Sequence, residues 1–169
     1  ARAGKPQERL PDQKRIDAWL AQHRDGIIVS YINTDARTKA KSHYICTSRN
    51  AAQILQAAAI RHPNQQILFL PDKYLGAVAL AQSGVDPERV DLYDGACHVH
   101  SKISENALEE AWDRYPDAEL LIHPECGCAS SCMARTLRGE MRYKNAYFFS
   151  TEEMLWHAQQ SPAREFIVA

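Results

Sequence analysis

A regular alternation of short apolar runs with helix-length segments constrains the fold of this chain more than any other feature. Short, largely apolar runs that we expect to be strands occur at 27–32, 67–70, 90–93, 120–122, 146–149 and 166–168. Segments with helical spacing or helix caps lie around them, at about 11–23, 51–58, 72–82, 104–115 and 151–160. Short uninterrupted apolar runs are typical of strands buried on both faces. Their alternation with helices predicts βαβ units, a parallel sheet and an α/β fold.

Part of this pattern occurs twice. Residues 26–33 form an apolar run that ends in Tyr31 and Asn33, and residues 118–125 form one that ends in His123 and Glu125. A strand places residues i and i+2 on one face. Each pair should therefore project together at a strand's carboxyl end, where open α/β sheets bind ligands.

The repeat continues into the next helix of each copy. Thr47 and Ser48 precede one expected helix, and Ser150 and Thr151 open the other. Because a helix N-terminus attracts anions, these hydroxyl pairs are candidate anion-binding residues.

Composition excludes several classes of partner. Twenty Lys and Arg residues against twenty-one Asp and Glu give a net charge of −1, which does not favour a nucleic acid or a charged membrane surface. The apolar runs are too short to cross a bilayer, and residues 1–15 do not read as a signal peptide. An odd count of five cysteines without a secretion signal indicates a reducing, cytoplasmic compartment. Since the chain does not begin with Met, we interpret it as a processed or excised segment.

Two groups of thiols are candidate metal or redox sites. Cys97 and His100 follow an expected strand and suit a cluster thiolate with a nearby imidazole, or else a buried free cysteine. Cys126, Cys128 and Cys132 could hold zinc or an iron–sulfur cluster, form a reversible disulfide, or be accessory. Their spacing matches no standard zinc or ferredoxin signature.

The pair His123 and Glu125 suits general acid/base work, since an imidazole and a carboxylate lie on one strand face. The alternative is a strand end whose polar residues meet solvent.

Five motifs in register resemble the quinolinate synthase family; they are Val29–Thr34, Cys46–Ala51, Phe69–Gly76, Gly95–His100 and His123–Cys126. The resemblance runs from about residue 26 to 169. It implies three similar three-layer αβα domains with short parallel sheets, arranged around a pseudo-threefold axis. On this basis residues 1–25 are a helix and linker from a missing first domain, 26–118 the complete middle domain, and 119–169 an incomplete third domain.

The resemblance also implies roles for matching residues. Each domain of that family gives one cysteine to a [4Fe–4S] cluster whose fourth iron is open to substrate, and Cys97 matches the middle domain's ligand. His100, His123 and Glu125 match catalytic residues. The positions that match substrate-binding residues are Tyr31, Asn33, Thr47, Ser48, Ser150 and Thr151.

The implied activity is that of a cytoplasmic transferase of NAD biosynthesis, which condenses iminoaspartate with dihydroxyacetone phosphate to quinolinate. Its partners would be these substrates and the missing first- and third-domain segments; a homo-oligomer stays open, and no nucleic acid or membrane is expected. With one cluster ligand of three, this chain alone is expected to be inactive. The alternatives are a non-catalytic metal or redox module built on Cys126, Cys128 and Cys132, and an inert α/β fragment that pairs with a missing partner.

Overall fold

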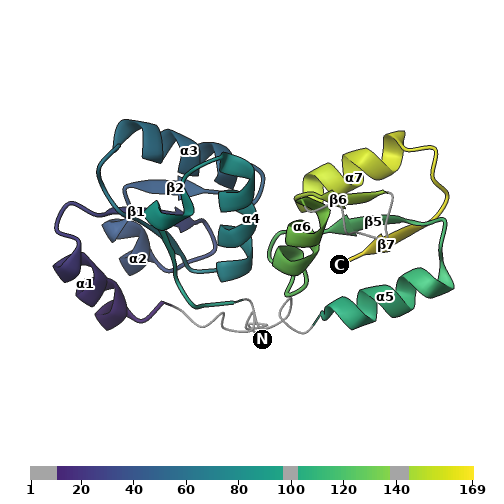
Figure 1. Cartoon of the computed structure of the whole chain (residues 1–169), viewed down its shortest axis with the longest axis horizontal. Helices are drawn as coiled ribbons and strands as arrows, with labels where there is room; N and C mark the ends of the chain where they lie inside the picture. The colour runs from purple at the N-terminus through teal and green to yellow at the C-terminus, as the bar shows by residue number, and fades with distance from the viewer. Residues whose placement is uncertain (1–10, 97–102, 138–144) are drawn as a thin grey trace, which may run out of the picture.

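The computed structural model describes residues 11–96, 103–137 and 145–169. They form two α/β units, each with a parallel sheet flanked by helices (Figure 1). The strand at 27–31 pairs in parallel with the strand at 67–70, which confirms the expected parallel sheet. No helix in these ranges has the length and apolar character that a membrane span requires.

The first unit holds a four-stranded sheet in the order β2-β1-β3-β4. Its strands are β1 (Ile27–Tyr31), β2 (Tyr44–Cys46), β3 (Ile67–Leu70) and β4 (Val90–Leu92). Its helices are α1 (Gln13–Gln22), α2 (Ala36–Lys41), α3 (Ala51–Arg61), α4 (Lys73–Ser83) and the 3₁₀ turn η1 (Pro87–Arg89).

Helices cover both faces of this first sheet because alternate residues of its strands point to opposite sides. Val29 and Phe69 pack into one core cluster with Leu55 of α3. Ile28 packs into another with Ile16 of α1. Burial on both faces explains why these strands read as continuous apolar runs rather than as alternating ones.

The second unit holds a three-stranded sheet in the order β6-β5-β7. Its strands are β5 (Glu119–Ile122), β6 (Ala146–Phe148) and β7 (Phe166–Val168), and its helices are α5 (Glu105–Arg114), α6 (Ala129–Leu137) and α7 (Thr151–Gln160). Helix α5 packs against β7. Helices α4 and α6 pack together between the two units (Figure 1).

The two sheets repeat one another in strand order and in register. Val29 of β1 lies opposite Tyr44 of β2, and Leu121 of β5 lies opposite Tyr147 of β6. The β1–β3 and β5–β7 ladders correspond in the same way. This register aligns Tyr31 with His123, as the repeat in the sequence predicts.

Two α-helices and one strand were not expected from the sequence. Helix α2 has only six residues, and it begins because the Asp35 carboxylate accepts a hydrogen bond from the Thr38 N–H at 2.7 Å. Strand β2 has three residues and pairs at the edge of the first sheet. Helix α6 lies after Cys126, outside the segments that the sequence predicted to be helical.

Candidate functional site

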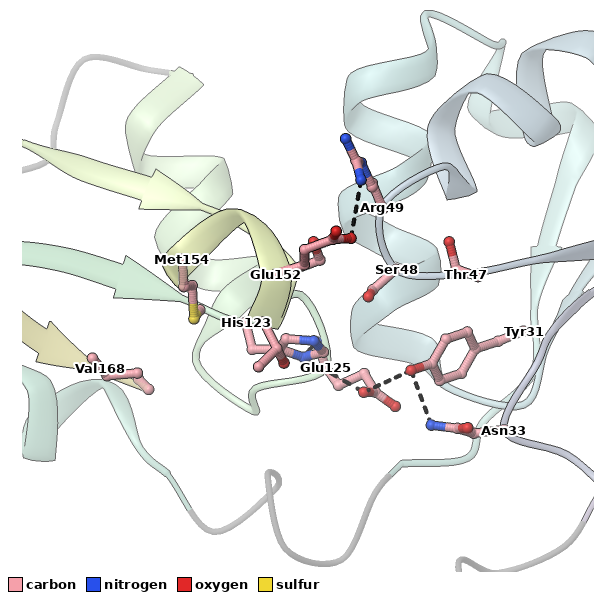
Figure 2. A pocket seen from close by; sticks show the side chains of 13 residues that line it. Tyr31, Asn33, Thr47, Ser48, Arg49, His123, Glu125, Glu152, Met154 and Val168 are labelled. Carbon is pink, nitrogen blue, oxygen red and sulfur yellow. Dashed lines mark hydrogen bonds and ion pairs between the residues drawn. The ribbon is translucent and has the colours of Figure 1, made fainter. Parts of the chain in front are cut away.

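A pocket of about 580 Å³ lies where the two units meet, a volume typical of small-molecule sites (Figure 2). It forms at the carboxyl ends of β1 and β5 and beside the N-termini of α3 and α7. The predicted site residues that line it are Tyr31, Asn33, Thr47, Ser48, His123, Glu125, Ser150 and Thr151. The other two, Cys97 and His100, lie outside the described residues.

The polar pairs of the two repeats contact each other in this pocket. The Tyr31 hydroxyl donates a hydrogen bond to Glu125 Oε2 at 3.1 Å, and Asn33 Nδ2 donates to the Tyr31 hydroxyl at 3.0 Å. Tyr31 is 6% exposed and Glu125 is 5% exposed. The carboxylate of one repeat is thus buried against the phenol of the other (Figure 2).

Hydrogen bonds with backbone groups hold both the main chain and the ring of His123. Its own N–H donates to the Ala169 carbonyl at 2.6 Å, which continues the sheet, and the Glu125 N–H donates to His123 Nδ1 at 3.3 Å. A neutral ring that accepts this bond carries its proton on Nε2. The same Nδ1 lies 3.5 Å from Glu125 Oε2. The imidazole of one strand-end residue and the carboxylate of the other therefore lie side by side at the pocket.

The wall next to α3 presents groups that suit an anion. Asn50 Oδ1 accepts hydrogen bonds from the Thr47 N–H at 2.7 Å and from the Thr47 hydroxyl at 3.0 Å, and it makes no side-chain bond to the helix that follows. The half-buried Ser48 lines the pocket, and its hydroxyl has no hydrogen-bond partner among the described residues. The first N–H groups of α3 are therefore left for water or a ligand.

The wall next to α7 is satisfied by its own side chains. Ser150 caps this helix and forms a capping box with Glu153. Glu153 Oε2 accepts hydrogen bonds from the Ser150 N–H at 2.9 Å and from the Ser150 hydroxyl at 2.7 Å. Thr151 follows as the first helical residue.

Sequence reasoning missed five residues that also line the pocket; they are Arg49, Glu152, Met154, Val168 and Ala169. Arg49 Nη1 and Glu152 Oε2 form an ion pair at 3.0 Å. The repeat in the sequence could have identified both charged residues, since Arg49 directly follows Ser48 and Glu152 directly follows Thr151, which aligns with Ser48.

The loop that leads to Cys97 is fixed against the first sheet. The Lys73 N–H donates to the Gly95 carbonyl at 2.8 Å, and a Cβ at Gly95 would lie 2.4 Å from the Pro71 carbonyl oxygen. Only glycine fits so close an approach. This contact holds residue 95 at the carboxyl end of β3, two residues before Cys97.

Cys126, Cys128 and Cys132 are buried in a cluster with Met133 of α6 and Val78 of α4, where the two units pack together. The sulfur atoms of Cys126 and Cys128 lie 2.7 Å apart. The hydrogen bond with Cys128 lowers the pKa of Cys126 to about 7, while the hydrogen bonds with Cys126 and Cys132, followed by burial, raise the pKa of Cys128. Within the described ranges, no group of three His, Cys, Asp or Glu side chains is arranged to hold a metal ion.

Comparison with known proteins identifies relatives over nearly the whole sequence. The profile of the family described as quinolinate synthetase A protein matches residues 2–169. The quinolinate synthase of Pyrobaculum aerophilum is 44% identical over 151 residues, which is 89% of this chain and 46% of that protein. That of Thermus thermophilus is 41% identical over 152 residues, 90% of this chain and 45% of that protein. That of Mycobacterium tuberculosis is 36% identical over 159 residues, 94% of this chain and 44% of that protein.

The chain thus spans less than half the length of these curated relatives. The profile match covers the two units and the pocket between them. The chain therefore belongs to the quinolinate synthetase A family.

Proposed function

We propose that this chain supplies the middle domain and part of the third domain of a quinolinate synthase, which condenses iminoaspartate with dihydroxyacetone phosphate to quinolinate. The observation that carries the proposal is the pocket, where Tyr31, Asn33 and Ser48 of one repeat face His123 and Glu125 of the other. Both substrates are anions that carry carbonyl or imine groups. The pocket offers hydroxyl, amide and acid/base side chains for such groups.

The neutral polar residues bind and orient the substrates in this proposal. Ser48, Thr47 and the open N-terminus of α3 receive a carboxylate or phosphate. Tyr31 and Asn33 hydrogen-bond to substrate oxygens beside them, and Ser150 and Thr151 contribute from the opposite wall. Holding two reactants in one pocket lowers the entropic part of the barrier.

The titratable residues move protons. Ring closure with loss of phosphate and water needs protons removed from carbon and nitrogen and delivered to leaving oxygens. His123 Nδ1 lies 3.5 Å from Glu125 Oε2, so the two groups are placed to act on one substrate as an acid/base pair. His100 is proposed as a third acid/base residue.

Cys97 is proposed as one ligand of a [4Fe–4S] cluster, with two more cysteines from the missing domains. A thiolate is the usual ligand for such a cluster, and the Gly95 contact holds the preceding loop at the carboxyl edge of the first sheet. When bound, the cluster supplies an open iron that acts as a Lewis acid on substrate oxygens. The domain boundaries at 25 and 118 and the pseudo-threefold arrangement belong to the same proposal.

The test uses the intact natural protein that contains these residues, purified without oxygen. Iron and sulfide content and quinolinate formation are measured for the natural protein, for Cys97→Ser, and for Cys128→Ser as the matched control. We expect Cys97→Ser to lose both iron and quinolinate formation, and Cys128→Ser to keep both. Iron that survives Cys97→Ser and disappears with Cys128→Ser would instead favour a metal module built on Cys126, Cys128 and Cys132.

A further inference from the structure

An ion pair joins the two walls of the pocket at its rim. Arg49 follows Ser48 on the α3 wall, and its Nη1 lies 3.0 Å from Oε2 of Glu152 on the α7 wall. Both side chains are largely exposed, at 61% and 78%. In Figure 2 the pair lies on the other side of Ser48 from the Tyr31–Glu125 hydrogen bond.

The two charges occupy aligned positions of the repeat. Each residue directly follows a hydroxyl residue proposed to bind substrate, Ser48 in the first copy and Thr151 in the second. Fixing the distance between the guanidinium and the carboxylate therefore restrains the distance between these two hydroxyl groups. Glu153 is engaged in the capping box of α7, which leaves Glu152 as the nearer carboxylate for Arg49. The Nε atom of Arg49 lies 4.0 Å from Glu153 Oε1.

We propose that Arg49 and Glu152 form a clasp that sets the separation of the pocket walls, and thereby the affinity of the site for its anionic substrates. The choice of substrates rests on the proposed function. An exposed ion pair adds little to global stability, so the clasp acts on the geometry of the pocket rather than on folding. Both residues are positioning residues and take no part in proton transfer.

A charge-reversal cycle in the intact natural protein tests the clasp. Arg49→Glu places a carboxylate beside Glu152, and Glu152→Arg places a guanidinium beside Arg49, so each single variant replaces attraction by repulsion. We expect each to raise the KM for dihydroxyacetone phosphate about fivefold, with kcat changed less than about twofold, given the usual size of exposed pairs. The double variant restores attraction, and its KM should return to within about twofold of the natural value. Arg61→Glu, at the far end of α3, makes the same change of net charge and should leave KM unchanged.

Two results would overturn the clasp. Single variants with an unchanged KM would show that the pair does not restrain the walls. Single variants with a raised KM that the double variant does not restore would show that Arg49 contacts the substrate directly.

Amide hydrogen exchange of 48–54 and 151–154 gives a readout that does not need activity. Exchange should be faster in each single variant and return to the natural rate in the double variant. If the natural protein forms no quinolinate while exchange follows this pattern, the proposed function fails and the clasp stands. If the protein forms quinolinate while the charge reversals change neither the KM nor the amide exchange rates, the clasp fails and the proposed function stands.

Discussion

The two repeats have the same order of strands and helices around the pocket, but the helices that form its walls begin at different positions. In the second repeat, α7 begins at Thr151, immediately after the Ser150 cap. Thr151 aligns with Ser48, yet α3 begins at Ala51, three residues later in the alignment. The first repeat thus leaves a non-helical turn at the position where the second has already formed helix.

A single pair of aligned residues accounts for much of this difference. Glu153 closes the capping box of α7 with a carboxylate, which also offsets the positive end of the helix. The aligned residue in the first repeat is Asn50, whose neutral amide bonds Thr47 and leaves the helix end uncompensated. The strand ends differ in the same direction, since the neutral Tyr31 and Asn33 of the first repeat align with His123 and Glu125 of the second. Under the proposed function, one repeat provides a surface for an anion, and the other provides the groups that carry protons.

The largest effect should come from removing the polar groups at the aligned strand ends, one repeat at a time. Glu125→Gln removes the carboxylate that faces His123, and we expect kcat for quinolinate formation to fall at least about 100-fold with little change in KM. Asn33→Ala removes a neutral contact and should act mainly on KM. Steady-state kinetics of the intact protein separates the two outcomes. A loss of kcat in Asn33→Ala that equals the loss in Glu125→Gln would contradict this division of roles.

Much of the fold could be predicted because its signals are local. Strands buried on both faces appear as apolar runs, and the carboxyl edge of a parallel sheet collects residues such as Tyr31 and His123 whatever the tertiary packing. Helix α2 and strand β2 gave no such signal. The short helix depends on one Asp35 cap, and β2 has three residues at a sheet edge, with Ile45 40% exposed.

The contacts across the pocket could not be predicted from sequence. Tyr31 and Glu125 are separated by 94 positions, and Arg49 and Glu152 by 103. Such pairs depend on how the two units pack, which strand and helix periodicity does not specify. The residue types at strand ends identified both Tyr31 and Glu125 but neither Arg49 nor Glu152, and the pairing of each contact required the structure.

Two thiols, Cys46 in the first unit and Cys126 in the second, should have opposite effects on the pH dependence of stability. Burial raises the pKa of Cys46 to about 12, whereas the hydrogen bond with Cys128 lowers the pKa of Cys126 to about 7. Above pH 9.0 the unfolded chain releases the Cys46 proton while the folded chain keeps it, so the free energy of unfolding should fall by about 1.4 kcal/mol per pH unit. Between about pH 7 and 9.0 the reverse holds for Cys126, whose thiolate favours the folded state as pH rises.

Urea unfolding from about pH 7 to about pH 10.5 checks both signs. Cys46→Ala should flatten the decline above about pH 9 relative to the natural protein, and Cys126→Ala should remove the rise below it. A decline of the same slope in Cys46→Ala would show that this thiol titrates normally in the folded chain.

The difference between the two helix N-termini can be removed with one substitution. Asn50→Asp places a carboxylate where the second repeat has Glu153, and it should repel an anionic substrate at the α3 wall. We expect the KM for dihydroxyacetone phosphate to rise about fivefold, and the free energy of unfolding to rise by about 0.5 kcal/mol because the negative charge offsets the helix end. An unchanged KM would place the anion elsewhere in the pocket. Asn50→Gln keeps the amide and serves as the neutral control.

The last prediction concerns stability alone and tests the α7 wall. Ser150→Ala removes the hydroxyl that caps α7 and bonds Glu153, and the free energy of unfolding should fall by about 1 kcal/mol. The aligned Thr47→Ala should cost less, because the exposed Thr47 hydroxyl bonds the Asn50 side chain and caps no helix N–H. Urea denaturation of both variants at one fixed pH measures the difference between their losses in free energy of unfolding. Equal losses would mean that the two helix ends are stabilised alike, and the open N-terminus of α3 would then need another explanation than the absence of a cap.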